Sequence, residues 1–206
     1  MRRVLGNFTL LLRGRGIAAI MLLATTALMA RALGPAEFGM VVVMQTYILL
    51  IRGLLNFKQF QAIIRYGVPA YDADDTRTLR RLIGISRRLD LYTSVIATAV
   101  AVGMAPLIGP LMGLDRDQVF LLMAYGLVLL TSRNVTGIGI LRLLDRFDIL
   151  GKKETIGPAI RLVGVAMAWW LEGPFAAYIA ILALAYICEN FYVIWHGHRE
   201  YVRHVG

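Results

Sequence analysis

The chain has 206 residues, of which 58% are hydrophobic and 17% charged, and its formal net charge is +9. A soluble domain has about a quarter of its residues charged, so this composition favours an integral membrane protein. The positive charge lies in short segments between apolar runs, which is the pattern that orients membrane proteins and argues against nucleic-acid binding. The single cysteine, Cys188, excludes an intrachain disulfide and a multi-cysteine metal site.

Six apolar segments follow one another along the chain, each of a length that crosses a bilayer at 1.5 Å per residue. These predicted spans cover residues 17–33, 39–57, 91–114, 119–141, 155–171 and 175–195. Between the second and third spans, Asp74 or Asp75 can cap a further helix over about residues 75–90. We expect this helix to lie on the inner leaflet with its arginines near anionic lipid headgroups; a solvated surface helix is the alternative.

Basic residues alternate between the connections of these spans, and 17 of the 22 lysines and arginines fall on one side. They are Arg2, Arg3, Arg13, Arg15, Lys58, Arg65, Arg77, Arg80, Arg81, Arg87, Arg88, Arg142, Arg146, Lys152, Lys153, Arg199 and Arg203. The opposite connections hold only Arg31 and Arg116. Because cytoplasmic loops carry the excess of lysine and arginine, this pattern predicts an all-α membrane protein with both termini in the cytoplasm.

Three arginines lie inside the apolar spans, where a charge costs roughly 2.5–3.5 kcal/mol on insertion scales. Arg52, Arg133 and Arg161 are each expected roughly 8–12 Å from the cytoplasmic boundary. They can ring one cavity that binds a diphosphate or an acidic sugar, or each can extend separately to the interface. With the polar residues Asn134 and Gln45, they form the predicted substrate site.

Acidic and histidine residues offer few candidates for chemistry. Glu189, in the inner half of the sixth span, is predicted as a counter-charge for one of the arginines. The tail histidines His196, His198 and His204 do not share a helical face with an acidic or thiol partner, so no metal site is predicted. No pattern typical of a catalytic site or a cofactor site occurs, and we expect a protein that is not an enzyme.

Three segments stand in a characteristic order: RALGPAEFG at residues 31–39, QAIIRY at 61–66 and LRLLDRFD at 141–148. In these segments the chain resembles the polysaccharide flippases, the O-antigen and exopolysaccharide transporters of the multidrug/oligosaccharidyl-lipid/polysaccharide exporter superfamily. Members are not enzymes. The resemblance implies a bacterial inner-membrane protein that moves undecaprenyl-diphosphate-linked oligosaccharide outward by alternating access, for the biosynthesis of cell-surface polysaccharide.

The resemblance also implies a partner. Family members have twelve to fourteen spans in two six-helix lobes, and residues 1–206 correspond to the N-terminal lobe alone. We therefore expect a truncated or split half-transporter, completed by a second lobe as a separate chain or a parallel copy, and working with polysaccharide assembly enzymes. Two alternatives stay open: an exporter of drugs or small molecules from the same superfamily, and a membrane assembly subunit that does not transport.

Overall fold

The computed structural model describes the backbone of residues 2–55 and 60–204, and the side chains from residue 14 onward within those ranges. Residues 56–57 of the second predicted span, Lys58, and the side chains of Arg2, Arg3 and Arg13 lie outside this part. The described residues form seven α-helices and one 3-10 helix. These are α1 (Arg2–Leu55), α2 (Phe60–Asp72), α3 (Thr76–Leu111), α4 (Arg116–Gly126), η1 (Leu127–Thr131), α5 (Val135–Leu143), α6 (Phe147–Trp170) and α7 (Phe175–His204).

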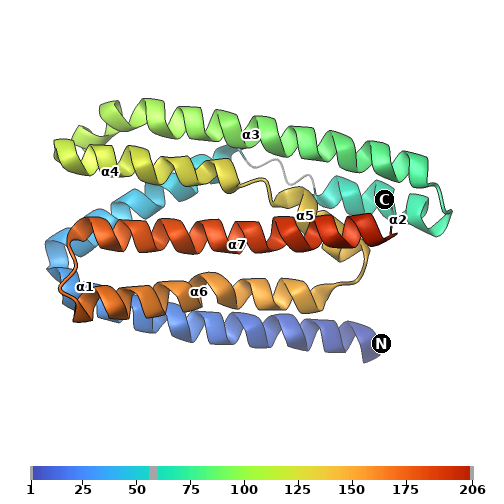
Figure 1. Ribbon diagram of the computed structural model, residues 1–206, viewed down its shortest axis with the longest axis horizontal. Helices are drawn as coiled ribbons and strands as arrows, with labels where there is room; N and C mark the ends of the chain where they lie inside the picture. Colours follow the sequence, from blue (N-terminus) through green and yellow to red (C-terminus); the bar gives the residue numbers. More distant parts are fainter. Residues whose placement is uncertain (1, 56–59, 205–206) are drawn as a thin grey trace.

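The helices run along one long axis, and both ends of the chain lie at the same end of the bundle (Figure 1). Helix α1 reverses direction at Gly34, whose φ of 71° is in the left-handed region that glycine adopts without strain. Pro35 follows, and a proline disfavours helical geometry in the residue before it. This kink divides α1 into two antiparallel segments, as the first two predicted spans require.

Four helical stretches are long and apolar enough to cross a membrane. They are Gly14–Leu55, Thr76–Leu111, Arg116–Leu143 and Phe175–His204. Within the described residues α6, which holds the fifth predicted span, is not among them, and it carries Lys152, Lys153, Glu154 and Arg161. The all-helical architecture with several membrane-length helices is consistent with a multi-pass membrane protein.

The predicted interfacial helix at 75–90 is wrong as a separate element, because α3 runs without a break from Thr76 to Leu111. Its predicted cap is confirmed: the Asp75 carboxylate accepts a hydrogen bond from the Thr78 N–H at 3.0 Å. Leu79 and Ile83 are buried against Ile140 of α5, so protein covers this part of the segment's apolar face, whereas Leu89 further along is 43% exposed. Helix α2, between the second and third predicted spans, was not predicted.

The fourth predicted span, 119–141, is also not one continuous helix. Helix α4 passes into η1, and the helix resumes only at Val135. A polar side chain at the break bonds to the backbone of the preceding turn: the Thr131 hydroxyl donates to the Val128 carbonyl at 2.7 Å. Because such local hydrogen bonds compete with the helical ladder, this polar stretch favours a broken span.

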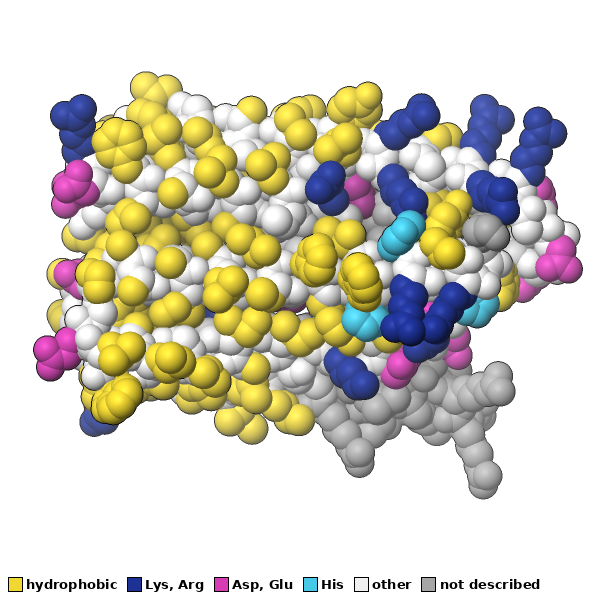
Figure 2. Space-filling model, in the orientation of Figure 1, with side chains coloured by type: hydrophobic (Ala, Val, Ile, Leu, Met, Phe, Trp, Pro, Cys, Tyr) yellow, Lys and Arg dark blue, Asp and Glu magenta, His cyan; other side chains and the backbone are white. Residues whose placement is uncertain are grey.

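The main hydrophobic core joins α1, α3, α4, α6 and α7 in the half of the bundle away from the termini. Its most deeply buried members include Val41, Met44, Ala101, Leu122, Val165 and Leu182, each at most 1% exposed. On the face drawn in Figure 2, hydrophobic side chains cover this half, whereas lysines and arginines gather towards the end that carries the termini. The molecule thus has an apolar half and a basic half.

Candidate polar cleft between α3, α5 and α7

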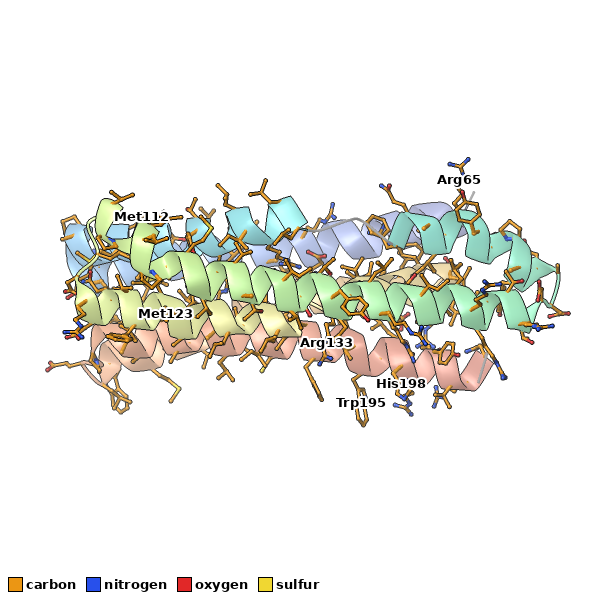
Figure 3. All side chains as sticks on the ribbon, turned by 90° about the horizontal axis from the view of Figure 1, so that it is seen from above. Arg65, Met112, Met123, Arg133, Trp195 and His198 are labelled. Atoms are coloured by element: carbon orange, nitrogen blue, oxygen red, sulfur yellow. The ribbon has the colours of Figure 1, made fainter. Side chains whose placement is uncertain are left out.

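A cleft of about 300 Å³ lies between α3, α5 and α7. Its polar lining consists of Arg87, Asp90, Arg133, Thr136 and His198. Small-molecule sites begin at about this volume. Figure 3 shows Arg133 near the middle of the bundle's length, with Trp195 and His198 on the same side, whereas Arg65 lies on the opposite side.

Close contact between α5 and α7 forms one wall of the cleft. A Cβ atom on Gly197 would lie 2.7 Å from the Cα of Gly137, and one on Gly137 would lie 2.9 Å from the carbonyl oxygen of Val193. A larger residue at either position therefore requires the two helices to move apart. Small residues allow this kind of approach between helices in membranes.

Asp90 is the buried acid of the cleft, with 2% of its surface exposed. Its Oδ2 accepts a hydrogen bond at 2.8 Å from the backbone N–H of Thr136, the second residue of α5. Asn134 precedes α5 but makes no side-chain capping bond, so a carboxylate from another helix serves as the cap.

Asp90 was not predicted as a site residue, although the sequence holds a signal for it. Ile83, Ser86, Asp90 and Ser94 follow one another at spacings of three or four residues and form the buried face of α3. An acid in register with a buried face indicates a buried carboxylate. The predicted surface helix ended near residue 90, so Asp90 was not compared with the residues on either side of it.

The two arginines of the cleft, Arg87 on α3 and Arg133 just before α5, are both exposed. The Arg87 Nη2 lies 3.4 Å from Nδ1 of His198, and its guanidinium carbon lies 4.6 Å from the centre of the Tyr201 ring. A guanidinium has no acceptor, so Nδ1 of His198 accepts in this arrangement. Arg133 forms no ion pair or hydrogen bond with another described residue.

Arg52 and Arg161 lie elsewhere, so the structure does not place the three predicted arginines around one cavity. Arg52 lines a separate small pocket, and its guanidinium carbon lies 5.2 Å from the centre of the Tyr186 ring. Arg161 is near enough to Tyr125 to act on it electrostatically, and Tyr125 is similarly near Tyr186. The two arginines thus lie near tyrosines, and the Tyr186 ring on α7 is a cation–π partner for Arg52.

Asn134 and Gln45 differ in their surroundings. Asn134 is 1% exposed, and its Nδ2 donates to Oδ1 of Asn190 at 2.6 Å. Asn190 in turn donates to the Thr131 hydroxyl at 3.1 Å, so these amides join α7 to both sides of the helix break. Gln45 is half-buried on α1 and hydrogen-bonds to none of the residues described.

Glu189 pairs with a lysine, so the prediction of an arginine partner is wrong. Its Oε1 lies 2.9 Å from Nζ of Lys153 on α6. A Cβ atom at Gly157 would lie 2.6 Å from Oε2 of Glu189, which shows how closely this carboxylate approaches α6. The missing side chain at Gly157 gives Glu189 room to reach α6, one turn from Lys153.

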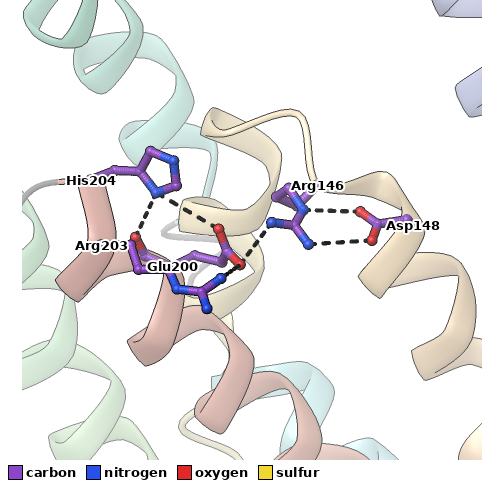
Figure 4. A network of polar contacts seen from close by, with 5 residues as sticks. All are labelled: Arg146, Asp148, Glu200, Arg203 and His204. Atoms are coloured by element: carbon purple, nitrogen blue, oxygen red, sulfur yellow. Dashed lines mark hydrogen bonds and ion pairs between the residues drawn. The ribbon is translucent and has the colours of Figure 1, made fainter.

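A network of charged residues holds the end of α7 against the turn between α5 and α6 (Figure 4). Glu200, 3% exposed, accepts from Nη1 of Arg146 at 2.7 Å, and Arg203 and His204 each approach it to 3.7 Å. Burial works to raise the pKa of Asp148, but hydrogen bonds from Arg146 hold it below its ordinary value. No group of histidine, cysteine and acidic residues in the described ranges can hold a metal ion.

Comparison with known proteins gives one distant relative. The chain is 26% identical over 175 residues to the inner membrane protein YghQ of Escherichia coli (strain K12), an alignment that covers 85% of this chain and 49% of the relative. The chain therefore spans about half the length of this relative. No protein-family model matches the chain, and no solved structure matches it significantly. The relative and the apolar helices together support a multi-pass inner-membrane protein.

Proposed function

We propose that this protein is one six-helix lobe of a transporter that moves a lipid-diphosphate-linked oligosaccharide across the inner membrane for cell-surface polysaccharide biosynthesis. The cleft between α3, α5 and α7 carries the proposal. Arg87 and Arg133 supply cationic forks for phosphate oxygens, and neither is neutralised by an acidic side chain among the described residues.

The position of the cleft suits a headgroup whose lipid tail stays in the bilayer. Arg133 lies about midway along the bundle and His198 lies nearer the end that carries the termini (Figure 3). That end is also rich in lysine and arginine on the face drawn in Figure 2. With this end in the cytoplasm and six spans across the bilayer, a diphosphate enters from the cytosolic side while its tail remains beside the apolar half.

A second lobe completes the transport cycle. The relative is about twice as long as the aligned region, and the family that the chain resembles has two lobes. A partner lobe, either a separate chain or a second copy, rocks against this one and opens the cleft to each side in turn.

A drug exporter is the competing function, and Asp90 is the observation that favours it, because a cationic drug needs a buried carboxylate. The surroundings of Asp90 argue against this role. Its carboxylate lies at the N-terminus of α5, whose dipole is positive there, and Arg87 and Arg133 line the same cleft. Glu189, the acid in the sixth predicted span, is paired with Lys153.

The test uses a strain whose surface polysaccharide depends on this gene. Arg133→Gln and Arg87→Gln each remove one headgroup cation, and we expect roughly a tenfold or greater loss of surface polysaccharide at unchanged protein level. Arg116→Gln is the matched control, because Arg116 is an exposed arginine at the start of α4 and outside the cleft. Normal polysaccharide in both cleft variants would sink the proposal.

A further inference from the structure

Two buried oxygen atoms, on residues that line the cleft, form no hydrogen bond of full geometry with the described residues, although the Thr136 side chain lies close enough to Asp90 to interact with it. They are Oδ1 of Asp90 and Oγ1 of Thr136. The two residues are 2% and 3% exposed, and both line the cleft. Because a buried polar atom without a partner costs free energy, such atoms are rare in proteins, and a bound ligand is one source of the missing partner.

The nearby cations leave Asp90 Oδ1 unpaired. Arg87 is one helical turn before Asp90 but extends to His198 and Tyr201 on α7. Arg133 forms no ion pair with Asp90. The N-terminus of α5 satisfies only the other carboxylate oxygen, Oδ2, through the Thr136 N–H. The cleft therefore has exposed cations beside a buried carboxylate and a buried hydroxyl, both of which have lone pairs that can accept a further hydrogen bond.

These two kinds of group match the two parts of a glycosylated phosphate. Phosphate oxygens accept hydrogen bonds from arginine, whereas sugar hydroxyl and amide groups donate them. We propose that Asp90 and Thr136 bind hydroxyl or amide hydrogens of the sugar next to the diphosphate. This inference rests on the proposed function and makes the two residues specificity determinants, because a lipid diphosphate without a sugar leaves both oxygens unpaired.

The test compares two soluble analogues on the purified full chain in detergent. One is farnesyl diphosphate, and the other is the same lipid carrying one N-acetylglucosamine; native mass spectrometry measures the affinity of each. We expect the wild type to bind the glycosylated lipid roughly ten- to a hundredfold more tightly, as a hydrogen bond to a charged group implies. Asp90→Asn and Thr136→Val should both reduce this preference, measured as the ratio of the two affinities within each variant.

Both variants keep the hydrogen bond that caps α5, so neither should unfold the cleft. Asn at position 90 can still accept from the Thr136 N–H, and Val at position 136 keeps the backbone donor of that cap. Thr25→Val is the matched control: Thr25 is 3% exposed and its hydroxyl bonds only within α1, so the sugar preference should persist. If Asp90 only stores a proton, Asp90→Asn resembles the protonated acid and keeps the preference, which overturns the inference.

Two further outcomes separate this inference from the proposed function. Equal affinity of the wild type for both lipids overturns the sugar site but keeps the headgroup site. Binding of neither lipid by the wild type contradicts the proposed function itself, and the sugar site falls with it.

Discussion

The apolar half and the basic half of the bundle are built from the same long helices but differ in how the space between those helices is filled. In the apolar half, Met44, Leu122 and Leu182 are at most 1% exposed and fill the space between helices. In the basic half, α3, α5 and α7 enclose a cleft lined by the buried polar side chains of Asp90 and Thr136, each with an oxygen that lacks a fully formed hydrogen bond. One half stabilises the bundle by close packing, and the other gives up some stability to hold a polar cleft.

The helix break between η1 and α5 lies at the border of the two halves. There the Ser132 hydroxyl lies 2.7 Å from that of Tyr186, and Asn134 bonds to Asn190. These contacts supply partners for Ser132 and Asn134 where the fourth membrane stretch stops being helical. The break also points the N-terminus of α5 at Asp90, so the cleft depends on it.

The largest expected effect tests the apolar half. Leu182→Ala removes a side chain that is 1% exposed in the main core, and we expect the free energy of unfolding to fall by about 2–5 kcal/mol. Thermal unfolding in detergent measures the loss. Leu184→Ala is the control on the same helix, because Leu184 is 54% exposed and should cost much less. Equal losses would mean that burial in the main core does not set the stability of the apolar half.

A smaller effect tests the close contact between α5 and α7 that forms one wall of the cleft. In Gly197→Val the added Cβ would lie 2.7 Å from the Cα of Gly137, and the methyl groups need still more room. Helices α5 and α7 must therefore separate. We expect a loss of about 1–3 kcal/mol in unfolding free energy. Unlike Leu182→Ala, this change should also weaken binding of farnesyl diphosphate, because it displaces the helix that carries Thr136.

The matched control for this change is Gly103→Val. Gly103 lies within α3 and has open space where a Cβ would be added. Valine there should leave lipid binding unchanged. Unaltered lipid binding in Gly197→Val would show that the cleft does not require the contact between α5 and α7.

The sequence predicted where the apolar helices lie more accurately than which polar residues contact one another. Runs of apolar residues and the turn at Gly34-Pro35 carry local signals, and the structure has helices at all of them. The pairing of Asp90 with α5 joins residues 46 positions apart, so no local pattern could reveal it. The same holds for Arg52 and Arg133, whose similar predicted depth did not indicate which helix faces they occupy.

The smallest expected effect concerns Asp75, the capping residue just before α3. Hydrogen bonds from Thr78 hold the pKa of the Asp75 carboxyl below its ordinary value of 3.8. A depressed pKa means that the charged form stabilises the folded state. This contribution is complete above pH 3.8 and is lost as the pH falls through the lower folded-state value.

Hydrogen exchange of the first-turn amides should therefore quicken at low pH, after correction for the intrinsic pH dependence of exchange. Asp75→Asn keeps a capping oxygen but does not titrate, so its corrected exchange should not change with pH in this range. The cleft should be unaffected in both proteins, because Asp90 lies about four turns further along α3. A simultaneous change in lipid binding would mean that the start of α3 and the cleft are coupled, and that the basic half acts as one unit.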